Sequence, residues 1–85
     1  MTYCYRHDVL DQLERHGVRP TPSTRPELVH EFVSDLYRFE LRRLRERLIR
    51  GEIAKRDYFG HVVDLRRQYP LISLKPWQWL EPESR

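Results

Sequence analysis

The stretch TRPELVHEFVSDLYRFELRRLRERLIRG, residues 24–51, decides the fold of this chain. Thr24 is placed to cap a helix, Pro26 suits the first turn, and Glu27 stands at the capping-box position. Gly51 supplies the left-handed residue that often ends a helix. The stretch therefore predicts one long central helix over residues 25–50.

The length of this helix is large for the chain that carries it. The protein has 85 residues, of which 39% are hydrophobic, so we expect a single helical domain over residues 1–85 with one modest core. A compact domain of this size has a radius of gyration of about 12 Å, whereas a helix of about 25 residues is about 37 Å long. The central helix should protrude, and a partner or a second copy would cover the overhang.

A shorter helix is predicted before the central one, over residues 5–16. Its apolar residues recur at the three-and-four spacing of an amphipathic helix: Tyr5, Val9, Leu10 and Leu13. Gly17 is expected to end it, with Val18 touching Leu13. Pro20 and Pro22 then predict a stiff linker into the central helix.

A third helix is predicted over residues 54–69, and it should form an antiparallel hairpin with the central helix. Ala54 occupies its N-cap position, although alanine has no side-chain acceptor for a backbone N–H. Gly60 lies inside this helix, which suggests the close approach of another element. Pro70 ends the helix, and a tryptophan-containing tail, residues 70–85, follows as an extended segment or a single turn. The sequence thus predicts an all-α, three-helix domain.

The apolar side chains of the central helix cover more than half of its circumference. This apolar sector is wider than the surface that a single neighbouring element can bury. We expect one side to pack within the chain and another to bind a protein partner. The tail offers Trp77 and Trp79, which either cover the hairpin core or insert into a partner. The expected partner-binding residues are Tyr37, Leu41, Leu44, Leu48, Trp77 and Trp79.

Glu40 projects into the apolar sector of the central helix, where a carboxylate needs a partner. A buried ion pair with Arg43 or Arg66 is the preferred interpretation. A catalytic role for Glu40 together with His30 is the weaker alternative, because general acid-base catalysis requires a second group converging on the same pocket.

The second half of the central helix is rich in arginine. An arginine-rich helix can neutralise phosphates, so the alternative function is nucleic-acid binding. The formal net charge of +3 is small, and Glu46 is spaced to pair with Arg42 or Arg50. The candidate nucleic-acid contacts are Arg42, Arg45, Arg47, Arg50 and Arg56.

No pattern of metal ligands or catalytic groups is complete in the sequence. Cys4 and His7 form one Cys-x-x-His pair, but a structural zinc site requires a second pair. We therefore expect no metal, no cofactor and no enzymatic activity. A single cysteine, together with the lack of a leader peptide or a membrane-spanning run, favours a cytoplasmic protein.

These observations lead to one functional hypothesis and one alternative. The hypothesis is a small non-enzymatic protein-interaction or accessory module, a homodimer that binds another protein through the central helix and the tryptophan tail. The alternative is an arginine-mediated nucleic-acid-binding protein.

Overall fold

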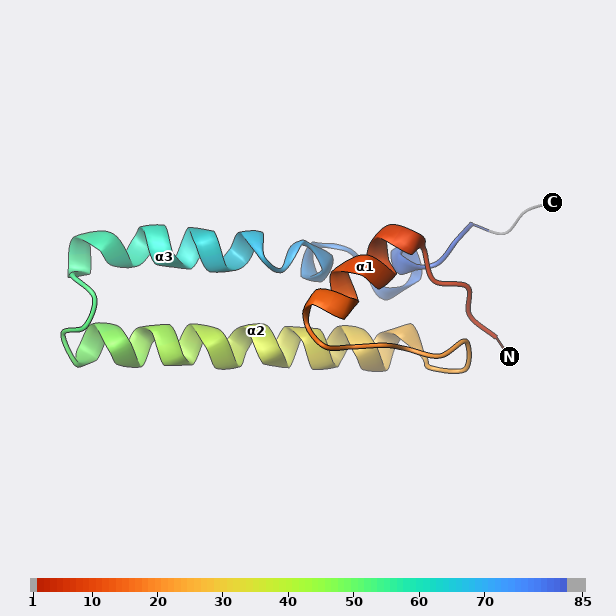
Figure 1. Cartoon of the computed structure of the whole chain (residues 1–85), viewed down its shortest axis with the longest axis horizontal. Coiled ribbons are helices and arrows are strands. Elements are labelled where there is room, and N and C mark those ends of the chain that lie inside the picture. Colours follow the sequence, from red (N-terminus) through yellow and green to blue (C-terminus); the bar gives the residue numbers. More distant parts are fainter. Residues whose placement is uncertain (1, 83–85) are drawn as a thin grey trace.

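The computed structural model of the chain describes residues 2–82 and confirms an all-α fold. Within this range the chain forms α1 (His7–Arg15), α2 (Pro26–Ile49), α3 (Lys55–Arg67) and two 3₁₀ turns, η1 (Pro70–Ser73) and η2 (Pro76–Trp79). The helices α2 and α3 run antiparallel and form the predicted hairpin (Figure 1). The predicted tail thus contains two short turns, and its last residues, 83–85, lie outside the described residues.

The molecule is long and thin. Its principal extents are 54 × 18 × 17 Å and its radius of gyration is 15.7 Å, compared with about 12 Å for a compact domain of this length. The hairpin of α2 and α3 extends to one side as a two-helix stalk, whereas α1, η1 and η2 gather around the other half of α2 (Figure 1). The long helix therefore extends well beyond the core, as its length predicts.

Two glycines end α1 and α2 as the sequence predicts. Gly17 and Gly51 have positive φ angles of 76° and 79°. After each glycine the next backbone N–H reaches back over one turn: Val18 N donates to the carbonyl oxygen of Leu13 and Glu52 N to that of Arg47, each at 2.9 Å. Both helix ends are Schellman motifs, which satisfy carbonyl groups that the helix leaves free.

The helix starts differ in part from the sequence prediction. The N-cap of α2 is Arg25, one residue later than predicted, and it makes no side-chain capping bond. The Thr24 hydroxyl instead accepts a hydrogen bond from the backbone N–H of Thr21 at 2.9 Å, which closes a turn in the linker. Ala54 is the N-cap of α3 and has no capping bond, as expected of alanine.

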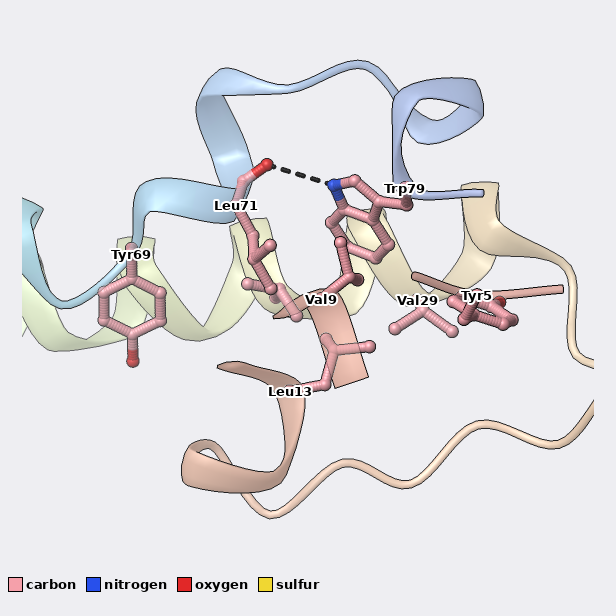
Figure 2. Packing of buried hydrophobic residues seen from close by; sticks show 8 residues of the cluster. Tyr5, Val9, Leu13, Val29, Tyr69, Leu71 and Trp79 are labelled. Carbon is pink, nitrogen blue, oxygen red and sulfur yellow. Dashed lines mark hydrogen bonds between the residues drawn. The ribbon is translucent and has the colours of Figure 1, made fainter. Parts of the chain in front are cut away.

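One buried cluster joins α1, the first half of α2 and the tail. Trp79 is its largest fully buried side chain, and Figure 2 shows the indole N–H directed at the carbonyl of Leu71, with a donor–acceptor distance of 3.3 Å. The tail therefore packs on the core of its own chain. The buried members are Tyr5, Val9, Leu13, Val29, Val33, Tyr69, Leu71 and Trp79.

The first residues of the chain hold the tail in place. The N–H of Arg6 donates to the carbonyl of Trp79 at 2.9 Å, and the N–H of Glu81 donates to the carbonyl of Cys4 at 2.8 Å. Tyr5 and Leu80 form an isolated antiparallel bridge between these bonds. The backbone around Trp79 is thus fixed by hydrogen bonds to a segment more than 70 residues away in the sequence.

The stalk is thinly packed in comparison. No residue of α3 is buried, and the buried apolar side chains at this end are Leu44 and Ile53. Gly60 does not mark a close approach, contrary to the sequence prediction, because a Cβ atom built there meets nothing within 4 Å. The stalk relies on a single line of half-buried side chains between two helices, which include Leu41, Leu48, Tyr58, Val62 and Leu65.

Candidate functional site

Glu40 lies half-buried in the middle of α2, opposite the end of α3. Its Oε2 atom accepts a hydrogen bond from the hydroxyl of Tyr69. The Tyr69 ring stacks on His16 of the α1 end, with ring centroids 4.3 Å apart and planes 12° apart. It also lies 5.3 Å from the ring of Tyr37. Tyr69 therefore connects three segments around the Glu40 carboxylate.

The environment of Tyr69 raises the pKa of its hydroxyl well above the ordinary value. Burial is the largest cause, and the hydrogen bond to Glu40 and the negative charge of that carboxylate add to it. The hydroxyl therefore stays protonated at physiological pH and remains a donor. This arrangement suits a structural hydrogen bond, whereas a catalytic base needs a pKa close to the working pH.

The predicted arginine partners of Glu40 are replaced by this tyrosine. Among the described residues, no ion pair within 4 Å joins Glu40 to Arg43 or Arg66. Both arginines are exposed, and the Arg43 guanidinium lies 6.0 Å from the ring centroid of Phe39. Hydration and the aromatic ring stabilise Arg43 without a carboxylate.

His30 and Glu40 do not converge on one pocket. The His30 Nε2 atom is 2.8 Å from the carbonyl oxygen of Leu74, and its ring packs at 5.2 Å from that of Trp79. The two surface hollows beside Glu40 are lined by residues of the stalk and of the α1 end, and His30 is not among the residues that line them. The arrangement therefore gives Glu40 no second catalytic group from His30.

The two tail tryptophans have opposite environments. Trp79 is fully buried within the chain, whereas Trp77 is 69% exposed. The two side chains are two residues apart in a 3₁₀ turn, which directs them to different sides. Of this predicted pair, Trp77 alone is available to a partner.

The predicted partner-binding residues of α2 lie on the side that faces the rest of the chain. Leu44 is buried, and Tyr37, Leu41 and Leu48 are half-buried. Leu44 lines a hollow of the stalk together with Leu65 of α3. The side of α2 that the chain leaves uncovered is a different one.

The uncovered side of α2 carries four large apolar side chains, which we call the far face. Their exposed fractions range from 53% to 75%. Three of them, Leu28, Phe32 and Phe39, fall within an arc of about 40° in helical projection. The fourth, Ile49, follows Leu28 by three heptads and lies about 60° to one side of that arc. The far face consists of Leu28, Phe32, Phe39 and Ile49. The spacing of these four residues can be seen in the sequence. It does not show which side of the apolar sector of α2 packs against the rest of the chain and which side stays exposed.

The candidate nucleic-acid contacts are exposed on the stalk. In the part of the chain that the structure describes, Arg42, Arg45, Arg47 and Arg56 have no carboxylate within 4 Å. Arg50 differs, since it lies 3.3 Å from Glu46 and 3.9 Å from Glu52. The predicted pairing of Glu46 with Arg50 is confirmed, which leaves four of the five arginines available to an anion.

Residues 2–82 offer neither a metal site nor a membrane-spanning helix. These residues contain no group of three or more His, Cys, Asp or Glu side chains arranged to hold a metal ion. The Cys4 residue is exposed and carries a free thiol. None of the described helices combines the length and the apolar character that a membrane crossing requires.

Comparison of the chain with protein-family models, with curated proteins and with solved structures finds no match. The functional proposal therefore depends on the geometry of the chain itself.

Proposed function

We propose that this chain is a small non-enzymatic protein-interaction module that associates with a second copy of itself. The observation that carries the proposal is the far face, where Leu28, Phe32, Phe39 and Ile49 are exposed on one helix. Contiguous exposed apolar side chains on a soluble protein are typical of interaction sites. Aromatic residues such as Phe32 and Phe39 are enriched in the cores of such sites.

The shape of the molecule supports the same proposal. The chain buries its core around the first half of α2, and α3 contributes no buried residue. A two-helix stalk of this thickness leaves one side of each helix uncovered (Figure 1). A second chain on the far face would give α2 the additional layer that a single hairpin cannot provide.

The chemistry around Glu40 supports a role without catalysis. Its carboxylate is engaged by the hydroxyl of Tyr69, whose raised pKa keeps it a donor. The exposed free thiol of Cys4 suits a reducing compartment, and we include a cytoplasmic location in the proposal on that ground.

Light scattering coupled to size-exclusion chromatography tests this proposal. We expect the mass of a dimer at high protein concentration and a shift towards the monomer on dilution. A mass equal to that of one chain at every concentration would contradict self-association.

The arginines of the stalk favour a second candidate function, nucleic-acid binding. Residues 40–67 contain nine basic and five acidic side chains, so the stalk carries a larger positive charge than the whole chain, whose net charge is +3.

A gel-shift series on generic DNA and RNA tests this candidate. Binding that weakens steeply with salt and is reduced in Arg42→Gln/Arg45→Gln supports it. An absence of binding at low salt excludes it. Arg19→Gln, which removes an arginine already paired with Glu14 at 2.9 Å, is the matched control.

A further inference from the structure

We infer that the second copy binds antiparallel along the far face of α2, with Phe39 next to the two-fold axis. This inference rests on the proposed self-association and adds the surface, the orientation and the register. It follows from the way in which apolar and charged residues are distributed about Phe39.

The apolar positions are nearly symmetric about Phe39. Leu28 precedes it by eleven residues and Ile49 follows it by ten, which corresponds to about 16 Å and about 15 Å along the helix axis. A two-fold axis at Phe39 therefore places Leu28 against Ile49 of the second copy, and the reverse pair forms on the other side. Phe39 meets its own copy at the axis, where two aromatic rings can pack together.

The charged positions are complementary under the same operation. Asp35 lies four residues before Phe39 and Arg42 three residues after it, so each Asp35 faces Arg42 of the second copy. Along the edge of the same face, Glu31 lies eight residues before Phe39 and Arg45 six after it, and these two also come together. One antiparallel dimer would thus form four ion pairs, two between Asp35 and Arg42 and two between Glu31 and Arg45.

Three of these charged side chains have no ion-pair partner among residues 2–82 of their own chain. Glu31, Arg42 and Arg45 are exposed, and in the described residues none of them lies within 4 Å of an opposite charge. Asp35 is bound by Arg38 at 2.8 Å, and its second carboxylate oxygen remains free to accept from another guanidinium. The second copy would therefore supply partners that the described part of one chain does not.

A parallel arrangement lacks this complementarity. Side-by-side parallel helices in register place Asp35 against Asp35 and Arg42 against Arg42, so that like charges meet on both sides of Phe39. Like charges across an interface oppose association. The charge pattern therefore selects the antiparallel orientation.

The remaining charged contacts of the antiparallel dimer involve side chains that already have an ion-pair partner within their own chain. Arg38 approaches its own copy near the axis, and it shares the Asp35 carboxylate with Arg42 of the second copy. Glu46 faces Phe32 of the second copy while it is bound to Arg50 at 3.3 Å. The aliphatic part of the Glu46 side chain can cover the Phe32 ring.

The structure also leaves space for the second copy. The buried residues of α2 point away from the mean direction of Leu28, Phe32 and Phe39, by about 80° for Val29 and by about 120–140° for Pro26, Val33 and Leu44. In Figure 1, α3 and the 3₁₀ turns lie on one side of α2, and the linker between α1 and α2 runs along the first half of α2. A shallow apolar hollow lined by Val18, Leu28, Val29 and Phe32 adjoins the end of the far face, where Ile49 of the second copy would bind.

The surface is tested by matched charge insertions in the full chain. Phe39→Glu places two carboxylates next to each other at the axis and should raise the dimer dissociation constant by about 100-fold or more. Phe59→Glu is the control, because Phe59 is also an exposed phenylalanine, at 76% against 53% for Phe39, but lies on α3. Circular dichroism should show that both variants keep the wild-type helix content. An unchanged dissociation constant for Phe39→Glu overturns the inference, as does an equal weakening by Phe59→Glu.

The orientation is tested by cross-linking in a Cys4→Ser background with a short bis-maleimide. In the antiparallel dimer the two Leu28 positions are about 33 Å apart, so Leu28→Cys alone should not cross-link, whereas a mixture of Leu28→Cys and Ile49→Cys chains should. Efficient cross-linking of Leu28→Cys with itself means a parallel dimer and overturns the inference.

The outcomes separate this inference from the proposed function. A wild-type chain that is monomeric at every concentration contradicts both. A stable dimer that is insensitive to Phe39→Glu, or that cross-links as a parallel pair, contradicts the inference while self-association stands. A dimer that is broken by Phe39→Glu and cross-links in the mixed pattern supports both.

Discussion

The hydroxyl of Tyr69 donates a hydrogen bond to the Oε2 atom of Glu40, and this bond ties the end of α3 to the middle of α2. It lies where the buried core of the molecule meets the thinly packed stalk. Tyr69 is buried and Glu40 is half-buried, so the loss of either group leaves the other without a partner in a site that water reaches only in part.

We predict that Tyr69→Phe lowers the free energy of unfolding by about 1–3 kcal/mol, since it leaves the half-buried Glu40 carboxylate without its donor. Urea denaturation measures this change. Tyr37→Phe is the matched control, because Tyr37 is half-buried beside the same ring and its hydroxyl makes no hydrogen bond to another described residue. An equal loss in the two variants would show that the Tyr69 hydroxyl has no special role.

The stability of the fold should fall at alkaline pH. The pKa of Tyr69 is raised in the folded chain, chiefly by burial and then by Glu40, whereas in the unfolded chain it is about 10. The folded state therefore holds its proton more tightly, and the stabilisation is complete below about pH 10 and is lost as the pH rises further. Above about pH 10, each tyrosine whose pKa is raised in the folded state lowers the free energy of unfolding by at most about 1.4 kcal/mol per pH unit.

Urea titrations between about pH 9 and about pH 11 measure this slope. Tyr5 contributes as well, because burial raises the pKa of its hydroxyl and the charges of Glu27 and Tyr3 raise it further. The slope should be smaller in Tyr69→Phe and smallest in Tyr5→Phe/Tyr69→Phe. The same slope in the wild type and in the double variant contradicts the assignment to these two residues.

The two tail tryptophans should differ strongly in their effect on stability. Trp79 is fully buried and Trp77 is 69% exposed. Trp79→Ala should remove about 3–5 kcal/mol, which is enough to unfold so small a domain, and Trp77→Ala should change stability by no more than about 0.5 kcal/mol. Trp79→Phe removes less side-chain volume from the core, so the comparison with Trp77 stays measurable if Trp79→Ala does not fold. Thermal melts with similar midpoints for the Trp79 and Trp77 variants would rule out this account of the core.

The parts of the fold that depend on neighbours in sequence were predictable. Gly17 and Gly51 end their helices because only glycine adopts positive φ without strain, and this property is visible in the sequence. The pairing of Glu40 with Tyr69 was not predictable, because the two residues are 29 positions apart and many side chains can satisfy a carboxylate. The broad apolar sector of α2 likewise predicted two packing directions, but the choice between them depends on where α1 and the tail pack.

Gly60 offers a direct way to stabilise the stalk. It lies inside α3, and an added Cβ atom meets nothing within 4 Å. Gly60→Ala should therefore raise the free energy of unfolding by about 0.5–1 kcal/mol through helix propensity alone. Gly51→Ala is the opposite control: with a φ angle of 79°, it should lower stability by about 1 kcal/mol or more. A destabilised Gly60→Ala would indicate a neighbour at that position, which the structure does not contain.

The start of α3 lacks a side-chain cap, and this position predicts a second stabilising change. Ala54 has the extended backbone conformation of an N-cap, with φ −68° and ψ 142°, but has no side-chain oxygen. Ala54→Ser should accept a hydrogen bond from the first turn of α3 and raise the free energy of unfolding by about 0.5–1 kcal/mol. Ala54→Val adds volume without an acceptor and should give no gain. Because the cap and Gly60 lie more than a turn apart without a shared partner, the gains of Ala54→Ser and Gly60→Ala should add within about 0.5 kcal/mol in a double variant. A thermal midpoint that Ala54→Ser leaves unchanged or lowers would place the N-cap of α3 elsewhere.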